Sequence, residues 1–172
     1  MRNKLFPSFI TISLLLVSAV ISASDTAYTP RFNRFKPVPE IHEYIVGDSV
    51  TGLYWQGCIA GLTMDYCLVG TAVTYTLDDA LDYCADLHWA GFESGWRLPN
   101  VKELSSIVDR KEISPSIDKE VFLETPSNFF WSSTIYSYYA HFAFYVEFNE
   151  GSVGLEDKFS KSYNVRCVRD GL

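Results

Sequence analysis

The sequence predicts an α+β fold with two helices, about six short strands and long connecting loops. Two segments carry apolar residues at helical spacing, and several short runs rich in aromatic and β-branched residues are typical of strands. Four cysteines lie among these segments, at positions 58, 67, 84 and 167. An even number of cysteines in an exported chain indicates disulfides. We therefore expect two helices packed on a small, mostly antiparallel sheet and tied by two disulfides.

Residues 1–23 are typical of a secretory signal peptide. Arg2 and Lys4 provide a positive start, residues 9–21 form an apolar run, and residues 21–23 are an acceptable cleavage site. The run is too short and too polar for a comfortable membrane span. We therefore expect export to the periplasm, the cell surface or the extracellular space, with no transmembrane segment after removal of the signal.

Removing 23 of the 172 residues leaves 149, a length that suits one domain. Without Arg2 and Lys4, the net charge of the chain changes from −7 to −9. An acidic balance of this size argues against nucleic acid or an anionic membrane as the main partner. Residues 24–43 contain three prolines and show no periodicity. We interpret them as a linker or loosely docked arm, which precedes a domain over residues 44–172.

The domain is expected to begin with two strands and a turn, followed by the first helix. Residues 44–46 and 50–55 have strand composition, and the turn is expected at Gly47-Asp48. The helix is expected over residues 77–87, with Thr76 as its N-cap and Cys84 on its apolar face.

Four cysteines allow three disulfide pairings. Cys58 and Cys67 bracket a short loop, whereas Cys84 lies in the first helix and Cys167 in the last strand-like run. The simplest pairing is Cys58–Cys67 with Cys84–Cys167. A zinc site is the alternative, but no two cysteines have the close Cys-x-x-Cys spacing and the histidines are scattered.

The start of the second helix has the clearest local signal in the chain. Pro99 ends the incoming strand, because it cannot donate a ladder hydrogen bond. Asn100 and Glu103 have the spacing of a capping box. Trp96 has a large surface to bury, and Arg97 can anchor the loop to a carbonyl or a carboxylate. We interpret all five residues as structural.

The last third of the chain is expected to form a strand, a hairpin and a final strand. The first strand, at residues 129–133, would bury Trp131 as another structural residue. Residues 143–155 have hairpin patterning, with Asn149-Glu150-Gly151 at the turn. A strand over residues 164–169 would close the sheet.

No motif in the sequence predicts catalysis. Gly-x-Ser-x-Gly, His-Glu-x-x-His and the phosphate-binding glycine loop are all absent from the sequence. Asp78 and Asp79 lie at a predicted helix start, where carboxylates complement the helix dipole. We therefore expect that the protein is not an enzyme.

Five motifs occur in a fixed order along the chain. They are residues 50–56, residues 96–104, Thr125-Pro126-Ser127, Trp131-Ser132-Ser133 and residues 165–169. Together they resemble the Lcl C-terminal domain family, which is named for the end domain of a collagen-like bacterial adhesin. The resemblance spans roughly residues 44 to 170.

The resemblance implies a C-type-lectin-like fold, in which an early helix and the last strand are commonly joined by a disulfide. It also implies an extracellular binding role, with sulfated polysaccharides as the ligands of the best-known member. A net charge of −9 does not suit a polyanion unless basic residues cluster locally. Calcium-dependent sugar lectins of this fold carry Trp-Asn-Asp where this chain has Trp131-Ser132-Ser133. Calcium is therefore a disfavoured alternative, and we expect no cofactor.

The segment between residues 136 and 163 is the candidate binding surface. Tyrosine provides a large, rigid contact with a polar tip, which is why binding surfaces are rich in it. The candidate ligand-binding residues are Tyr136, Tyr138, Tyr139, His141, Lys158 and Tyr163. The alternative is that these side chains pack in the core or simply lie in solvated loops.

The preferred hypothesis is an exported, non-catalytic, adhesin-like module that binds a glycan or a protein at the bacterial cell surface. One alternative is a structural or assembly subunit of an envelope or pilus complex. The other is a diversified target protein of a retroelement, because such proteins share the implied fold and vary residues in the same final segment.

Overall fold

The computed structural model describes residues 34–37, 43–63 and 65–171. The predicted signal peptide and most of the predicted arm lie outside these residues. The helices are α1 (Leu77–Ala85), α2 (Val101–Ser106) and a short 3-10 helix, η1 (Asp65–Cys67). The strands are β1 (Phe35–Pro37), β2 (Ile45–Asp48), β3 (Leu53–Gln56), β4 (Leu62–Thr63), β5 (Val69–Gly70), β6 (Thr74–Tyr75), β7 (Trp96–Arg97), β8 (Phe129–Ile135), β9 (Phe142–Glu147), β10 (Ser152–Asp157), β11 (Tyr163–Asn164) and β12 (Val168–Asp170). Among the described residues, no helix is long and apolar enough to cross a membrane.

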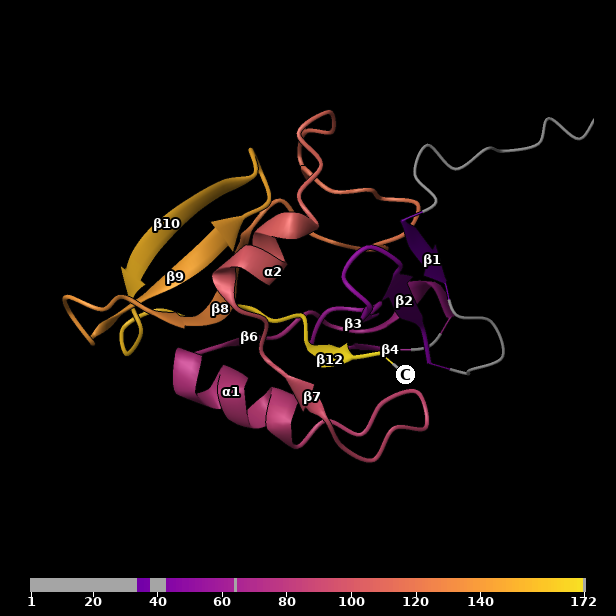
Figure 1. Ribbon diagram of the computed structural model, residues 1–172, viewed down its shortest axis with the longest axis horizontal. Coiled ribbons are helices and arrows are strands. Elements are labelled where there is room, and N and C mark those ends of the chain that lie inside the picture. The colour runs from indigo at the N-terminus through magenta and orange to yellow at the C-terminus, as the bar shows by residue number, and fades with distance from the viewer. Residues whose placement is uncertain (1–33, 38–42, 64, 172) are drawn as a thin grey trace, which may run out of the picture. The chain divides into compact units, whose positions relative to one another are not determined.

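Most strands belong to two five-stranded sheets (Figure 1). The first sheet has the order β1-β2-β3-β12-β7, the second has the order β10-β9-β8-β11-β6, and β4 pairs with β5. Pairing between the described strands is antiparallel except for a parallel bridge between β11 and β8. The α+β class, the two helices and the mostly antiparallel pairing are confirmed. The expectation of one sheet with about six strands is wrong.

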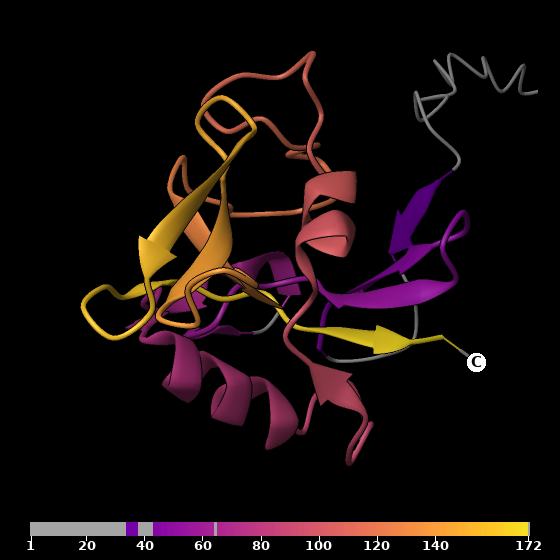
Figure 2. The ribbon, with the colours of Figure 1, turned by 60° about the vertical axis from the view of Figure 1, so that its left-hand side comes forward.

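The two α-helices lie on opposite faces of the second sheet (Figures 1 and 2). Helix α1 packs with Trp131 and Ala143 in one apolar cluster, which also contains Trp96 and both disulfides. Helix α2 packs with Phe130 and Val146, which face the other way, in a second cluster. Trp96 is 3 % exposed and Trp131 is fully buried. Both faces of this sheet are therefore covered near β8, and the sheet forms the middle layer of the packing.

The prediction of one last strand over residues 164–169 is wrong, because this segment divides into two strands in different sheets. Asn164 of β11 pairs with Thr74, whereas Val168 of β12 pairs with Trp55. Between these strands, Cys167 is held on both sides of its backbone. Its N–H donates to Oε1 of Gln56 (3.2 Å), and its carbonyl accepts from the Gln56 N–H (2.9 Å). One backbone bond and one side-chain bond to Gln56 therefore hold the chain where it crosses from one sheet to the other.

The turn of the first hairpin lies two residues later than predicted. Gly47 and Asp48 end β2, and the turn spans residues 49–52. The Asp48 carboxylate accepts from the Val50 N–H (3.0 Å) and the Thr51 hydroxyl (2.6 Å). Gly52 then takes a positive φ of 73°, which favours glycine. The turn follows the aspartate because its side chain hydrogen-bonds residues that come after it.

Part of the predicted arm is a strand. Residues 35–37 form β1, which pairs with β2. Just before it, the Arg34 guanidinium makes two bonds to the Asp48 carboxylate, at 2.8 Å from Nε and 2.7 Å from Nη2. Asp48 is 2 % exposed. This bidentate ion pair and the β1–β2 ladder tie residues 34–37 to the first sheet.

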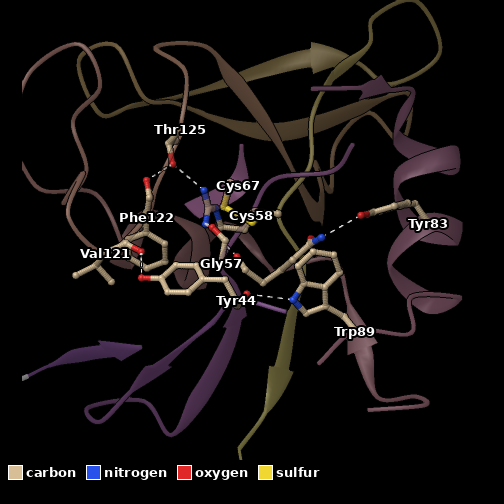
Figure 3. Close-up of a disulfide and its surroundings, with 11 residues drawn as sticks. Tyr44, Gly57, Cys58, Cys67, Tyr83, Trp89, Val121, Phe122 and Thr125 are labelled. Carbon is tan, nitrogen blue, oxygen red and sulfur yellow. Dashed lines mark hydrogen bonds between the residues drawn. A yellow bond between two sulfur atoms is a disulfide. The ribbon is translucent and has the colours of Figure 1, made fainter. Parts of the chain in front are cut away.

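Both disulfides favoured by the sequence analysis are present. Cys58–Cys67 spans 9 residues and Cys84–Cys167 spans 83. Tyr44 lies beside the first disulfide (Figure 3), where its hydroxyl donates to the Val121 carbonyl (2.8 Å). The Trp89 ring donates from Nε1 to the Tyr44 carbonyl (3.1 Å). Long-range hydrogen bonds therefore surround the shorter disulfide loop.

Arg166 is a buried guanidinium at the crossing between the sheets. It donates to the carbonyls of Gln56 (2.9 Å) and Gly57 (2.6 Å), and to Oγ1 of Thr125 (2.7 Å). Its carbon Cζ lies 4.9 Å from the centre of the Phe122 ring. Burial lowers the pKa of Arg166 to about 9, which leaves the group charged at neutral pH.

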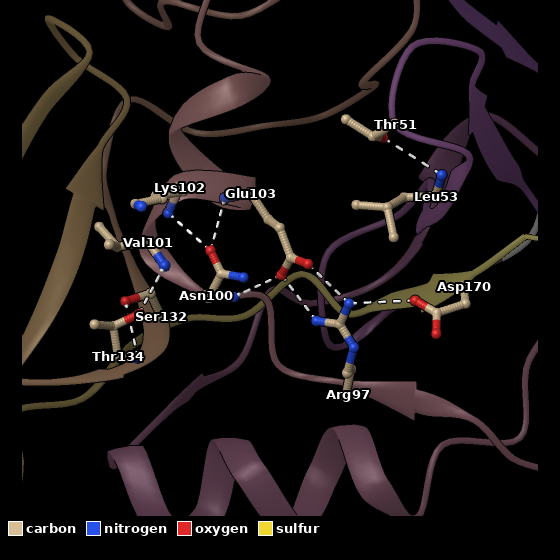
Figure 4. Close-up of polar contacts among 10 residues, drawn as sticks. All are labelled: Thr51, Leu53, Arg97, Asn100, Val101, Lys102, Glu103, Ser132, Thr134 and Asp170. Carbon is tan, nitrogen blue, oxygen red and sulfur yellow. Dashed lines mark hydrogen bonds and ion pairs between the residues drawn. The ribbon is translucent and has the colours of Figure 1, made fainter.

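Helix α2 begins as predicted (Figure 4). The Asn100 side chain accepts from the N–H groups of Lys102 (2.9 Å) and Glu103 (3.0 Å), and Glu103 accepts from the Asn100 N–H (2.8 Å). The Glu103 carboxylate also forms an ion pair. Arg97 donates to both of its oxygens at 2.8 Å and lies 3.4 Å from Asp170. One glutamate thus closes the capping box and anchors Arg97 of β7.

We predict that the longer disulfide stabilises the fold more than the shorter one. A longer closed loop restricts the unfolded chain more, so Cys84→Ala/Cys167→Ala should lose about 2 kcal/mol more than Cys58→Ala/Cys67→Ala. All four cysteines are at most 1 % exposed, so the two double variants lose similar buried volume. Urea unfolding measures both free energies. Equal losses, or a larger loss for the shorter loop, would contradict this ranking.

We also predict an acid-sensitive contribution from Asp48. Burial raises the pKa of its carboxyl, but the hydrogen bonds from Arg34 and Thr51 outweigh burial and lower this pKa from 3.8 to about 2. The native state is therefore stabilised above pH 3.8, and this stabilisation is lost as the pH falls through about 2. The free energy of unfolding of wild type should exceed that of Asp48→Asn by about 1–2 kcal/mol at pH 5. This difference should close near pH 2. Urea unfolding at both pH values measures the gap, with exposed Glu150→Gln as the control. A gap that does not change with pH would refute the assignment.

Candidate binding surface

Two neighbouring loops carry five of the six candidate ligand-binding residues. One loop joins β8 to β9 and contains Tyr136, Tyr138, Tyr139 and His141, and the other follows β10 and begins at Lys158. The Lys158 N–H donates to the His141 carbonyl (3.0 Å). The two loops therefore lie at the same end of the second sheet.

The tyrosines of the first loop form an exposed ring cluster. The Tyr136 ring lies 5.5 Å from Tyr138, 6.2 Å from Tyr139 and 6.0 Å from Phe144, measured between ring centres. Tyr138 is 80 % exposed and Tyr139 is 66 % exposed. Half-buried Tyr136 thus connects the two exposed rings to Phe144 of β9. We call the following set the aromatic hairpin surface: Tyr136, Tyr138, Tyr139, His141, Phe142, Phe144 and Phe159.

His141 and Lys158 meet at Phe159. The His141 ring lies 5.6 Å from the Phe159 ring, and Lys158 Nζ lies 4.7 Å from the centre of that ring. Lys158 also lies 3.8 Å from a carboxylate oxygen of Asp78 on α1. Because its charge is shared with Asp78, Lys158 is a weak candidate for holding an anionic ligand.

Tyr163 does not join the aromatic hairpin surface. Its ring lies 5.1 Å from Phe129, 4.5 Å from Trp131 and 5.4 Å from Tyr145. Burial, followed by the nearby Glu156 carboxylate, raises the pKa of Tyr163 to about 12. Tyr163 is therefore a packing residue of the second sheet, where β11 brings it against three other rings. The sequence did not reveal this because β11 pairs with β6 and β8, which lie far away in the chain.

Three rings of this surface were not predicted from the sequence. Phe142 is 37 % exposed and Phe159 is 57 % exposed, and Phe144 is half-buried beneath Tyr136. Alternation along residues 142–146 indicated a strand but not which positions the helices cover. Helix α2 covers Val146 but leaves the other end of β9 partly open. Only the packing of the folded protein shows that these three rings are partly open to solvent.

A hollow of about 280 Å³ lies along the first sheet, away from the aromatic hairpin surface. Its lining includes Arg34, Lys36, Asp48 and Tyr54. Arg34 is already paired with Asp48, whereas Lys36, which lines the hollow together with the Tyr54 ring, forms no ion pair with the described residues.

In the described part of the chain, no group of three or more His, Cys, Asp or Glu side chains is arranged to hold a metal ion. All four cysteines are in disulfides. His88 pairs with Glu93 at 3.1 Å, but both side chains are largely exposed. This geometry is that of a surface contact.

We predict that Tyr163 and Tyr138 respond differently to substitution. Tyr163→Ala removes a ring that contacts three others, so it should lower the free energy of unfolding by about 2–4 kcal/mol. Tyr138→Ala removes an 80 % exposed ring and should change it by less than about 0.5 kcal/mol. Thermal or urea unfolding of both variants measures the difference. If Tyr163→Ala is as stable as wild type, Tyr163 is not a packing residue.

A comparison with known protein families gives one match. The model of the Lcl C-terminal domain matches residues 44–169. This range contains both disulfides, both helices and the aromatic hairpin surface. No curated protein and no solved structure matches the chain. Because the match covers well over half of the sequence, the chain belongs to the Lcl C-terminal domain family.

Proposed function

We propose that this chain is an exported, non-catalytic binding module that recognises a glycan or protein ligand at the bacterial cell surface through its aromatic hairpin surface. The observation that carries this proposal is the ring cluster of Tyr136, Tyr138 and Tyr139, two members of which are mostly exposed. Exposed rings that gather at one place, above a covered sheet, are typical of recognition surfaces.

The arrangement of the rings supports binding. Tyr136 contacts both exposed tyrosines and the Phe144 ring beneath them. Rings already packed against one another lose little conformational freedom when a ligand docks, so more of the contact energy appears as affinity. Tyrosine hydroxyls add hydrogen-bonding groups at the edge of each ring. The same surface suits the apolar face of a sugar ring or an apolar protein side chain.

The charges near the surface favour a neutral or basic ligand. The chain has 21 acidic residues and 14 basic ones. Lys158, which lies over the Phe159 ring, also contacts the Asp78 carboxylate. A polyanion would meet a chain of net negative charge.

The family and the disulfides support an extracytoplasmic location. A Lcl C-terminal domain indicates a surface-associated protein, and paired cysteines persist in oxidising compartments. We propose that the fold is C-type-lectin-like, an assignment supported by the Cys84–Cys167 bridge between α1 and the residue before β12. The surface presents rings and hydroxyls rather than a nucleophile paired with a base, which supports a role without catalysis.

The test uses the two exposed tyrosines, because their replacement leaves the packing intact. Tyr138→Ser/Tyr139→Ser should keep the wild-type melting temperature and lose at least about tenfold in affinity, since each buried ring contributes more than about 1 kcal/mol to binding. Binding is measured on a glycan array and against a bacterial surface extract. Glycan capture identifies a lectin-like role, and retention of one partner protein identifies a protein receptor or an envelope or pilus assembly role.

The matched control is Tyr66→Ser. Tyr66 is 68 % exposed and is not part of the aromatic hairpin surface, so this variant should bind like wild type. Unchanged affinity of the Tyr138→Ser/Tyr139→Ser variant would place the binding site elsewhere on the domain. Equal loss in the control would show that exposed rings act without site specificity.

A further inference from the structure

Strand β10 (Ser152–Asp157) is an open edge of the second sheet. It pairs along all six residues with β9, with no bulge, and it is the first strand in the order of that sheet. Both ribbon views show it at the outer margin of the sheet, with no other described strand beyond it (Figures 1 and 2). An open strand edge presents backbone groups that a further strand can bind.

The register identifies which backbone groups point outward. The Lys158 N–H donates to the His141 carbonyl just beyond the strands, so Lys158 and His141 are a hydrogen-bonded pair. Every second pair of the ladder is then hydrogen-bonded as well, including Gly154 with Tyr145. Alternation in an antiparallel ladder then directs the N–H and C=O groups of Val153 and Leu155 away from β9. The bonds from Tyr136 N–H to the Phe142 carbonyl and from Phe148 N–H to the Asn128 carbonyl agree with this phase.

The outward N–H and C=O groups of Val153 and Leu155 have no described partner, whereas the N–H and C=O groups of Asp157 do. The Asp157 N–H donates to Oε1 of Glu156 (3.0 Å), and its carbonyl accepts from the Ser160 N–H (3.4 Å). Within the described residues, no hydrogen bond involves the N–H or C=O groups of Val153 and Leu155 on the outer side of the strand. The usable edge is therefore three residues long and centred on Gly154.

The central part of this edge, residues 153–155, carries no charge, and the acidic Glu156 and Asp157 follow at its end. Residues 152–157 contain no lysine, arginine or proline, and their register is regular. Val153 is 48 % exposed and Leu155 is 38 % exposed. Both side chains lie on the same face of the sheet as Phe144 and Val146, their partners on β9. The open edge thus continues an apolar row.

We propose that β10 pairs with β10 of a second copy of this chain, antiparallel, about a two-fold axis at Gly154. In this register Val153 lies opposite Leu155 of the second copy, and Leu155 lies opposite its Val153. The four outward groups of one chain then meet the four outward groups of the other in four backbone hydrogen bonds. The two sheets become one continuous sheet of ten strands.

The side chains suit this register on both faces. On one face each Val153 packs against a Leu155, which extends the row that ends at Phe144 and Val146. On the other face the two Gly154 residues lie opposite each other. The Tyr145 hydroxyl covers Gly154, and a Cβ built at Gly154 would lie 2.3 Å from this oxygen. Glycine at the axis therefore leaves the Tyr145 rings room on that face.

The carboxylates are placed so that none faces another directly. Glu156 lies opposite Ser152 of the second copy, and Asp157 lies opposite Gly151. The two Glu156 residues are offset by four residues, about 13 Å along the strands. This separation exceeds the Debye length at ordinary salt, so their repulsion is largely screened. Repulsion between two acidic chains remains at long range, so added salt should strengthen the dimer. An extended strand of an unrelated protein would meet the same backbone groups, but it would lack this symmetry.

The test is Val153→Pro in the mature, disulfide-bonded chain. The Val153 N–H points outward, so proline there leaves the bonds to β9 intact but removes two intermolecular bonds and blocks close approach. Sedimentation velocity is measured up to about 1 mM, because a small interface is expected to be weak. Wild type and the control Val153→Thr, which keeps the N–H and the branched shape, should form dimers with similar affinity. Val153→Pro should remain monomeric.

Amide hydrogen exchange of wild type tests the register without any variant. Exchange at Val153 and Leu155 should slow as the protein concentration rises, while exchange at Gly154 and Glu156, already bonded to β9, should not change. A chain that stays monomeric up to about 1 mM overturns the proposal. So does a dimer that Val153→Pro leaves intact, or one in which the protection of Val153 and Leu155 is unchanged.

Discussion

The buried guanidinium of Arg166 is the interaction on which the arrangement of the two sheets depends. Arg166 lies between β11 and β12, where the chain leaves the second sheet and enters the first. Its bonds to the carbonyls of Gln56 and Gly57 hold the end of β3, and its bond to Thr125 holds the loop before β8. A buried charge without enough acceptors is costly, so these three bonds and the Phe122 ring determine where the backbone must lie.

The same crossing supports the candidate binding surface. Cys167 follows Arg166 and is bonded to Cys84 of α1, so the helix, the crossing and the second sheet are linked covalently. Tyr163, just before the crossing, packs on Phe129, Trp131 and Tyr145. These rings fix β8 and β9, whose connecting loop carries the exposed tyrosines. The exposed tyrosine rings are therefore displayed by a hairpin whose base is packed, an arrangement that suits the proposed binding role.

Local chemistry in the sequence was sufficient to predict the elements whose signals lie within a few residues. The capping box of Asn100 and Glu103 and the N-cap Thr76 are present as predicted. The split of the last strand was not predictable in this way, because the partners of Arg166 are at least 41 residues away in the chain. The same applies to the candidate site. Among the described residues, the ring contacts of Tyr138 and Tyr139 are to nearby Tyr136, and both side chains are exposed. Tyr163 instead has three ring neighbours that only the folded sheet brings together.

The proposed dimer and the proposed binding surface are geometrically related. A two-fold axis through paired antiparallel edge strands runs perpendicular to the sheet, so the same face of both sheets points the same way. Phe142 and Phe144 of the aromatic hairpin surface share that face with Leu155. Two copies would then present their ring clusters on one side of a ten-stranded sheet. On a surface with repeated ligands, the second contact becomes intramolecular, so weak single-site affinity is converted into firm attachment. A weak edge pairing would make this gain depend on the local density of the protein, because only crowded chains would dimerise.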